Sequence, residues 1–201
     1  MTAQAGSTSS TLQAERRQLR QRLRAERRAL SAVERERADR AIAARIRSLG
    51  AFRRAARIGV FLAFDGEPSL TGLIAAAARC GKRFYAPVLE GLDMHFAELA
   101  TRGPLAKNFF GILEPGGARI DARRLDLVLT PLVAFDDRGV RIGVGRGYYD
   151  RCFGFLNGRS AWRRPKLLGV AYELQHVRAL ERATWDVPLW GAVTETEFRR
   201  F

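Results

Sequence analysis

The chain has 201 residues, a length that suits a single domain with a substantial core. Hydrophobic residues make up 47% and charged residues 28% of the chain, as in a globular protein, and no apolar run reaches the ~20 residues of a membrane span. The formal net charge is +14 and comes mostly from arginine, which suits polyanionic partners. The alternative is a solvated surface that is rich in arginine.

The start of the chain is small and polar. Residues 1–10 contain no apolar h-region, so we do not expect a secretory signal. Glu15 and Glu26 lie within an arginine-rich stretch and argue against an organelle transit peptide, because such peptides avoid acidic residues. We expect residues 1–11 to form a disordered tail and residues 12–201 to form one α/β domain.

Two helices are expected before the first strand. In residues 12–30, Leu19 and Leu23 share one face and arginines occupy the others. Ser31 and Glu34 match a capping box, which predicts the start of a second helix. Gly50 fits the end of that helix.

Further along the chain, short apolar runs alternate with helical patterns. We expect strands at residues 57–64, 84–89, 94–99, 125–130, 167–171 and 192–194. We expect helices at residues 69–79, 148–156 and 173–180, and loops at residues 101–124 and 157–165. This order predicts an α/β fold in three layers, with a mainly parallel sheet between helices on both faces, preceded by the two N-terminal helices.

Residues 141–151 (RIGVGRGYYDR) form the most informative segment of the chain. Glycine lets the backbone approach a ligand closely, and successive backbone N–H groups in such a loop can bind an anion. Arginine side chains add positive charge in a geometry that suits phosphate. The segment predicts a nucleotide-phosphate site with Arg141, Gly143, Gly145, Arg146, Gly147 and Arg151. The alternative is a tight glycine turn between a strand and a helix.

Asp150 is unexpected in a phosphate-binding loop, because a carboxylate repels phosphate unless a cation lies between them. Mg²⁺ commonly binds one or two carboxylates together with substrate phosphates, so we expect it here. The apolar run 125–131 ends in proline, as a buried strand does, and the turn 135–139 follows. This places the loop at the carboxyl end of a parallel sheet, where open α/β folds bind their ligands.

The segment 129–151 closely resembles the signature of the 5-formyltetrahydrofolate cyclo-ligases, also called 5,10-methenyltetrahydrofolate synthetases. The resemblance extends over most of the chain, from about Arg16 to Glu195. It implies that ATP and 5-formyltetrahydrofolate give 5,10-methenyltetrahydrofolate, ADP and phosphate. In that family the formyl oxygen attacks the γ-phosphate, and N10 then closes the ring with loss of phosphate.

The resemblance also implies roles for particular residues. ATP would be bound by Arg16, Arg20, Arg141, Gly143, Val144, Gly145, Arg146, Gly147, Tyr148 and Tyr149. The catalytic residues would be Arg146, Tyr148 and Asp150, and Mg²⁺ would be held by Asp150 and Asp186. Arg17 competes with Arg16, where the family more often has lysine, and Trp185 stands where the family often has His or Asn. On the residues alone, Asp186 is either a second carboxylate facing the metal or a turn or capping aspartate, and the second alternative is favoured.

The folate side of the site follows from the same resemblance. The substrate would contact Leu62, Glu67, Phe110, Val144, Gly145, Arg146, Gly147 and Tyr148. An exposed turn acid is the alternative for Glu67. Met94 also suits a pterin pocket, although core packing is the expected role for it.

The remaining reactive side chains indicate no second chemistry. Cys80 and Cys152 have neither zinc-ligand spacing nor a disulfide framework, so we expect reduced structural thiols in a cytoplasm. His95 and His176 lack metal or triad spacing and are not expected to be catalytic.

Two rival functions stay open at this stage. One is a basic protein that binds nucleic acid through its N-terminal arginine helix, and the other is a different ATP-dependent ligase or kinase. The chain lacks interleaved aromatic residues and zinc spacing, so we do not expect nucleic acid as a partner. ATP and polyglutamylated folate are themselves polyanions. We expect a cytoplasmic monomer with no membrane partner.

Overall fold

The computed structural model describes residues 4–100, 103–157 and 164–201, and its centre is an eight-stranded sheet. The spatial order is β12-β11-β10-β7-β1-β2-β3-β6. The bounds are β1 (Arg57–Gly59), β2 (Arg83–Glu90), β3 (Asp93–Glu98), β6 (Arg119–Ile120), β7 (Leu127–Pro131), β10 (Lys166–Val170), β11 (Gly191–Val193) and β12 (Phe198–Arg200). The five strands from β11 to β2 run parallel, and β12, β3 and β6 pair antiparallel at the two sides.

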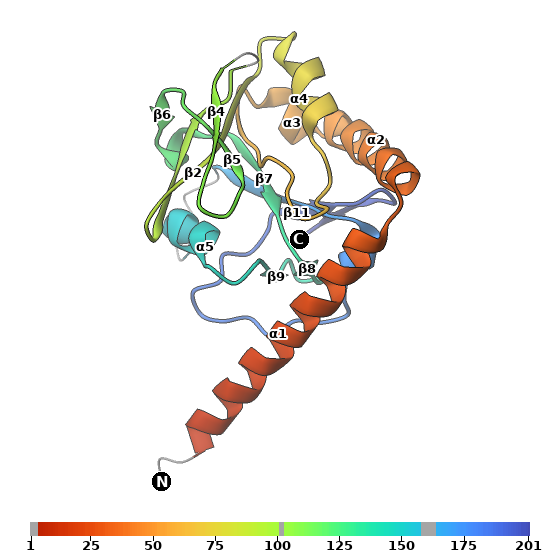
Figure 1. Cartoon of the computed structure of the whole chain (residues 1–201), viewed down its shortest axis with the longest axis vertical. Coiled ribbons are helices and arrows are strands. Elements are labelled where there is room, and N and C mark those ends of the chain that lie inside the picture. Colours follow the sequence, from red (N-terminus) through yellow and green to blue (C-terminus); the bar gives the residue numbers. More distant parts are fainter. Residues whose placement is uncertain (1–3, 101–102, 158–163) are drawn as a thin grey trace.

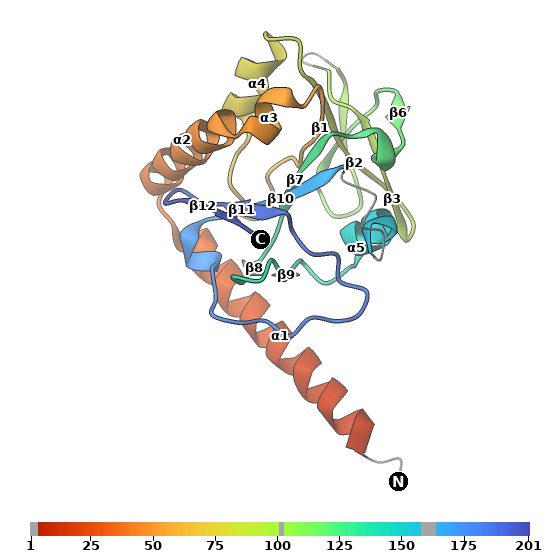
Figure 2. The same ribbon diagram turned by 180° about the vertical axis from the view of Figure 1, so that it is seen from behind.

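Helices cover both faces of this sheet (Figures 1 and 2). On one face, α2 (Ala32–Ser48), α3 (Gly50–Arg54) and α4 (Thr71–Ala78) share an apolar core with the sheet. On the other face, α5 (Tyr148–Phe153) buries Phe153 against Phe96, with ring centroids 5.8 Å apart. The predicted three-layer α/β fold with a mainly parallel sheet is confirmed.

The central strand β7 shows why the sequence forms this sandwich. Leu127 and Leu129 pack into the core beneath α2 and α4, whereas Val128 packs into the core on the α5 side. Successive side chains of a strand point to opposite faces. A strand buried on both faces is therefore apolar at every position, as this run is.

The two N-terminal helices are present. The predicted capping box holds the start of α2, since Ser31 N donates to Glu34 Oε2 at 2.8 Å and Glu34 N donates to Ser31 Oγ at 3.3 Å. α1 (Gln4–Ala29) buries Leu23 against the segment 133–142, and its N-terminal part extends away from the body (Figure 1). The predicted start at residue 12 was wrong. A helix propagates more easily than it nucleates, so residues 4–11, expected in a disordered tail, continue α1.

The expected loop at 101–124 was also wrong in part. It contains β4 (Leu105–Lys107) and β5 (Leu113–Pro115), which pair in an antiparallel hairpin, as well as β6 and the 3₁₀ turn Ala122–Arg124. A second short hairpin, β8 (Ala134–Phe135) with β9 (Arg141–Ile142), encloses the predicted turn. Two- and three-residue strands have too little periodicity to be visible in a sequence.

The bounds of several other elements differ from those expected from the sequence. The first strand is only β1, the helix expected at 173–180 is the 3₁₀ turn Glu173–Gln175, and α5 is followed by the 3₁₀ turn Gly154–Leu156. β12 was not predicted, and Gly50 begins α3 as well as following α2. Of the loop expected at 157–165, residues 158–163 lie outside the described residues.

No helix in the described ranges is both long enough and apolar enough to span a membrane. Cys80 and Cys152 are both free thiols; Cys80 is exposed and Cys152 is half-buried.

The packing of α5 leads to a stability prediction. Phe153 is fully buried, so Phe153→Ala should lower the free energy of unfolding by about 3–5 kcal/mol, through lost burial and a cavity. The matched control is Phe109→Ala, whose side chain is 96% exposed and which should change stability by less than about 0.5 kcal/mol. Urea denaturation of the three proteins tests this. Equal stability of both variants would contradict the packing of α5.

Candidate active site

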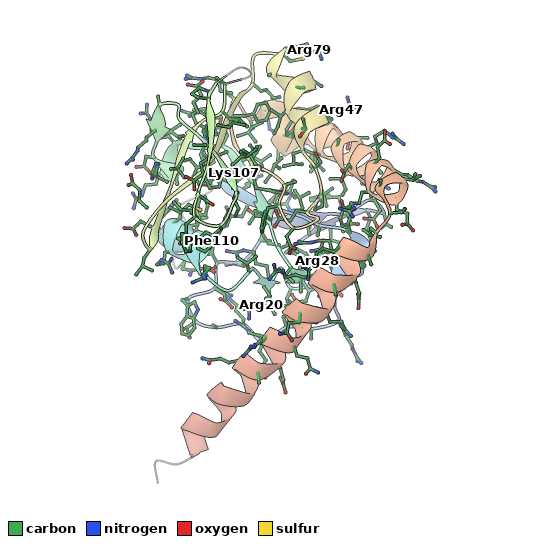
Figure 3. The ribbon with its side chains drawn as sticks, viewed as in Figure 1. Arg20, Arg28, Arg47, Arg79, Lys107 and Phe110 are labelled. Carbon is green, nitrogen blue, oxygen red and sulfur yellow. The ribbon has the colours of Figure 1, made fainter. Side chains whose placement is uncertain are left out.

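A cavity of about 470 Å³ opens at the carboxyl ends of β1 and β7. Its walls come from α1, the segment after β1, the β4–β5 hairpin, the glycine loop and the turn that carries Asp186. Figure 3 labels Arg20 on α1 and Phe110 on the hairpin. Fifteen of the residues predicted for the site line this one cavity: Arg16, Arg20, Leu62, Glu67, Phe110, Arg141, Gly143, Val144, Gly145, Arg146, Gly147, Tyr148, Tyr149, Asp150 and Asp186. Arg151, also predicted for the phosphate site, does not line it, because its guanidinium donates to the carbonyl oxygens of Leu92 and Arg146.

The glycine loop connects β9 to α5, in the predicted order of strand, loop and helix. Gly145 has φ +100° and Gly147 has φ +69°, a region that favours glycine over residues with a side chain. A Cβ at Gly147 would lie 2.9 Å from Nη1 of Arg151, and one at Gly145 would lie 3.5 Å from Cζ of Arg20. The two glycines therefore allow a left-handed backbone in the loop. They also leave room for the side chains of Arg20 and Arg151.

Arginines from α1 and β9 reach the loop from two sides. Nε of Arg20 donates to the carbonyl oxygen of Gly143 at 2.8 Å. Burial, together with the neighbouring charge of Arg16, lowers the pKa of Arg20 below its ordinary value. Arg16 lines the cavity, whereas its competitor Arg17 is exposed and does not.

Two of the arginines at the cavity have an N–H group that forms no hydrogen bond. Nε of Arg16 and Nε of Arg141 are buried without a hydrogen-bond partner among the described residues. An unsatisfied buried donor is costly, and an acceptor in the cavity would remove that cost. Both side chains line the cavity and bring positive charge to it, so the site is suited to an anion with several oxygen atoms.

Asp150 and Asp186 lie in the same cavity and are each neutralised by an arginine. Oδ1 of Asp150 accepts from Arg141 at 2.7 Å and from the backbone N–H of Val187 at 3.2 Å. Oδ2 of Asp186 accepts from Arg16 at 3.1 Å and from the N–H of Ala183 at 2.9 Å. Asp186 therefore stabilises its own turn and also lines the cavity.

These two aspartates are the candidate metal ligands. Within the described part of the chain, no group of three or more His, Cys, Asp or Glu side chains could hold a metal ion by itself. Each aspartate uses one carboxylate oxygen for its bonds to the described residues, so the second oxygen is available. Two carboxylates beside a phosphate site fit the preference of Mg²⁺, which completes its coordination with phosphate and water oxygens.

Glu67 also lines the cavity, and its side chain is only 11% exposed. The expected alternative, an exposed turn acid, is wrong. Oε2 of Glu67 accepts from the N–H of Phe64 at 3.1 Å, and Oε1 lies 3.9 Å from Nη1 of Arg27. Burial raises the pKa of Glu67 to about 7, and the charge of Arg27 opposes this rise. Half-buried Leu62 lines the cavity on the same segment.

Aromatic side chains surround the rest of the cavity. The guanidinium of Arg146 lies 5.1 Å from the ring centroid of Phe110, which joins the glycine loop to the hairpin. Oη of Tyr148 donates to the carbonyl of Gly91 at 3.0 Å. Oη of Tyr149 is buried without a partner in the described ranges, and burial raises its pKa above the ordinary value.

Some cavity residues were not predicted from the sequence. Arg24 lies one helical turn after Arg20 and donates to Oδ2 of Asp65 at 2.6 Å, so its spacing was a usable signal. Glu114 accepts from Nδ2 of Asn108 at 2.7 Å and from the N–H of Leu89 at 3.0 Å, which attaches the hairpin to β2. That contact had no sequence signal, since it joins residues far apart in the chain.

The residues set aside from the sequence lie elsewhere. Neither His95 nor His176 lines the cavity, and His176 is 2.8 Å from Oδ1 of Asp137. Burial raises the pKa of Cys152 to about 12, so its thiol is a poor nucleophile. Met94 packs in the core beside α5 and also lines the cavity.

Comparison with known proteins identifies the family of this chain. The model of the 5-formyltetrahydrofolate cyclo-ligase family matches residues 12–195. A 5-formyltetrahydrofolate cyclo-ligase of Haemophilus influenzae is 34% identical over 87% of this chain and 95% of its own length. One of Escherichia coli is 34% identical over 87% of this chain and 97% of its own length.

Two solved structures of 5,10-methenyltetrahydrofolate synthetases have a fold similar to that of this chain. An NMR structure of Aquifex aeolicus 5,10-methenyltetrahydrofolate synthetase has a TM-score of 0.80 and 31% identity, and the match covers 92% of each chain. A 5,10-methenyltetrahydrofolate synthetase of Mycoplasma pneumoniae shares the fold, with a TM-score of 0.71 at 22% identity over 90% of this chain and 98% of its own. The chain belongs to the 5-formyltetrahydrofolate cyclo-ligase family.

Proposed function

We propose that this protein uses ATP to convert 5-formyltetrahydrofolate to 5,10-methenyltetrahydrofolate, with release of ADP and phosphate. The observation that carries the proposal is the single cavity that gathers the glycine loop, arginines, two aspartates and Glu67, in a chain of this family. The cavity volume of about 470 Å³ lies within the ~300–1,000 Å³ range of ligand sites.

The chemistry explains why both ligands must be held together. A formamide oxygen is a poor leaving group, and transfer of the γ-phosphoryl group to it makes it a good one. N10 then attacks the activated carbon, and phosphate leaves. The protein therefore needs to position two ligands and stabilise the charge of the transferring phosphoryl group, without a nucleophile of its own.

On this reading, the phosphates lie between α1 and the glycine loop. Arg16, Arg20 and Arg141 supply positive charge, and the loop between Gly143 and Gly147 supplies backbone N–H groups. The support for this position is that the three arginines and the loop line the same cavity. Arg146 has an exposed guanidinium above Phe110, between the phosphates and the substrate.

We further propose that Asp150 and Asp186 hold Mg²⁺ at the phosphate end of the cavity. When bound, Mg²⁺ supplies positive charge that offsets the developing charge on the phosphate oxygens. The support is the pair of aspartates on one cavity wall and their arginine neighbours. In the complex these arginines would be shared between the aspartates and the phosphates.

The folate is assigned to the other half of the cavity, beside Leu62, Glu67, Phe110 and Tyr148. A pterin presents N–H donors along one edge, and a carboxylate can accept two of them. The flat ring system suits aromatic walls. The ionised form of Glu67 is therefore the form that binds.

We also propose a location, an oligomeric state and a view on nucleic acid as a partner. Two free thiols suit a reducing compartment, so we propose a cytoplasmic protein, and we keep the expectation of a monomer. For nucleic acid, the arginine helix is poorly placed, since Arg16, Arg20 and Arg24 face the cavity and bond to its walls.

The direct test is a spectrophotometric assay on the purified protein. With 5-formyltetrahydrofolate, ATP and Mg²⁺, we expect the near-UV absorbance of the methenyl product to rise, and to need all three components. If the folded protein binds ATP but forms no product, the assignment of folate as the substrate is wrong. It would favour a different ATP-dependent ligase or kinase, to be sought with a panel of substrates.

Replacing Asp150 with asparagine tests the metal ligand. The amide keeps an oxygen that can accept from Arg141, but it loses the charge that binds Mg²⁺. We expect kcat to fall by about 10²–10³-fold at saturating Mg²⁺ with an unchanged circular dichroism spectrum. Asp137→Asn, an exposed aspartate outside the cavity, is the matched control. Turnover of D150N close to that of this control would rule out the metal role.

Arg146→Ala tests the phosphate site. Loss of a charged hydrogen bond to phosphate should raise the KM for ATP by about tenfold or more. Arg124→Ala removes an exposed arginine outside the cavity and should change nothing. If only the KM for the folate rises in R146A, Arg146 belongs to the substrate side through Phe110 and not to ATP.

Glu67→Gln tests the folate carboxylate. We expect a higher KM for 5-formyltetrahydrofolate with an unchanged KM for ATP. In the wild type, the folate KM should fall as pH rises through about 7, because Glu67 ionises there, and Glu67→Gln should abolish this dependence. A pH profile that is the same in both proteins would contradict the assignment.

The same carboxyl also affects stability. Its pKa in the folded protein lies above the ordinary value of 4.5, so the folded state holds the proton more tightly than the unfolded state. Its contribution to stability is therefore fully present below about pH 4.5 and is lost as pH rises through about 7.

A further inference from the structure

Arg27 is a buried arginine that lies just outside the cavity. Its side chain is 1% exposed, which is rare for arginine unless it is paired. Its Nε donates to the carbonyl of Asp65 at 3.2 Å, and Nη2 donates to Oδ2 of the same residue at 3.1 Å. Nη1 donates to the carbonyl of Leu132 at 3.3 Å and lies 3.9 Å from Oε1 of Glu67.

These contacts join three parts of the fold. Arg27 belongs to α1, Leu132 follows β7, and residues 65–67 form the turn after the first strand segment. Asp65 has φ +54°, an unusual value for a residue with a side chain, and Gly66 follows at φ +76°. Arg27 bonds to both the backbone and the carboxylate of Asp65, so it supports the strained residue that lies two positions before Glu67.

Arg27 differs from the neighbouring arginines of α1 because it is buried and does not line the cavity. Arg16, Arg20 and Arg24 line the cavity, and they precede Arg27 at spacings that place all four on one side of the helix. Arg28, the next residue, is 56% exposed and reaches only Oδ1 of Asp65 at 3.5 Å. Arg20 and Arg28 are labelled on α1 in Figure 3.

We propose that Arg27 is a positioning residue for the folate: it fixes the Asp65–Glu67 turn against β7 and so sets Glu67 in the orientation that receives the substrate. This inference rests on the proposed function of Glu67. Arg27 touches neither ligand, and it acts on one half of the cavity only. The same helix carries the ATP arginines, so both ligands are positioned from one rigid element.

A purely structural arginine would give a different result. It would lower stability and affect both substrates or neither, whatever residue stands at position 67. A positioning residue raises the KM for the folate, leaves the KM for ATP unchanged, and has this effect only while Glu67 is present.

The experiment is a double-mutant cycle with Arg27→Lys and Glu67→Gln. Lysine keeps the charge but cannot reach Asp65, Leu132 and Glu67 together, because it lacks the planar guanidinium. We expect R27K alone to raise the folate KM by about tenfold with kcat within about threefold of wild type. In the Glu67→Gln background, the same change should alter the folate KM by less than about twofold.

Two further variants complete the design. Arg28→Lys changes the neighbouring arginine, which meets the same Asp65 but not Glu67, and should leave both KM values unchanged. Asp65→Asn loosens the turn from the other side and should repeat the effect of R27K. It therefore tests the same proposal if R27K does not fold.

The outcomes separate this inference from the proposed function. If the wild type does not turn over 5-formyltetrahydrofolate, the proposed function fails first. If the wild type is active, an unchanged folate KM in folded R27K overturns the positioning role, as does an effect of equal size in the Glu67→Gln background. If R27K does not fold, an unchanged folate KM in D65N overturns it.

Discussion

The site depends on the pairing of the arginines of α1 with acceptors at the carboxyl ends of the sheet. Arg16 bonds to Asp186, Arg20 to the carbonyl of Gly143, and Arg27 to Asp65. Each partner lies on a different loop, and these loops have little other regular structure to fix them. A charged hydrogen bond that is partly shielded from water is strong and directional. One helix therefore brings separate loops into a single cavity.

The geometry of these contacts favours arginine over lysine at the positions that line the cavity. A lysine would satisfy one acceptor at a time, whereas the planar guanidinium bonds to one partner and presents further N–H groups to another. Arg141 shows this division, since Nη2 pairs with Asp150 while its buried Nε has no partner among the described residues. The aspartates keep the arginines in place at the cavity wall.

Glu67 has the opposite environment from the two aspartates. It is largely buried and its nearest cation lies 3.9 Å away, so burial outweighs attraction and raises its pKa to about 7. Asp150 has an arginine at 2.7 Å. Acidic side chains in one cavity thus have different environments, because burial dominates at Glu67 whereas a guanidinium lies in direct contact with Asp150.

The sequence by itself determined the layers, the two leading helices with their Ser31–Glu34 cap, and the glycine loop, since these depend on local periodicity and on glycine's freedom at Gly145 and Gly147. It also predicted, through one long motif and its neighbours, residues that the structure gathers around one cavity. Only the tertiary structure decided that Arg16 and not Arg17 faces the cavity, that the β4–β5 hairpin forms a wall, and that Arg27 is buried beneath Glu67. Those features arise from contacts between residues far apart in the chain, and local sequence carries no record of which partner a side chain will meet.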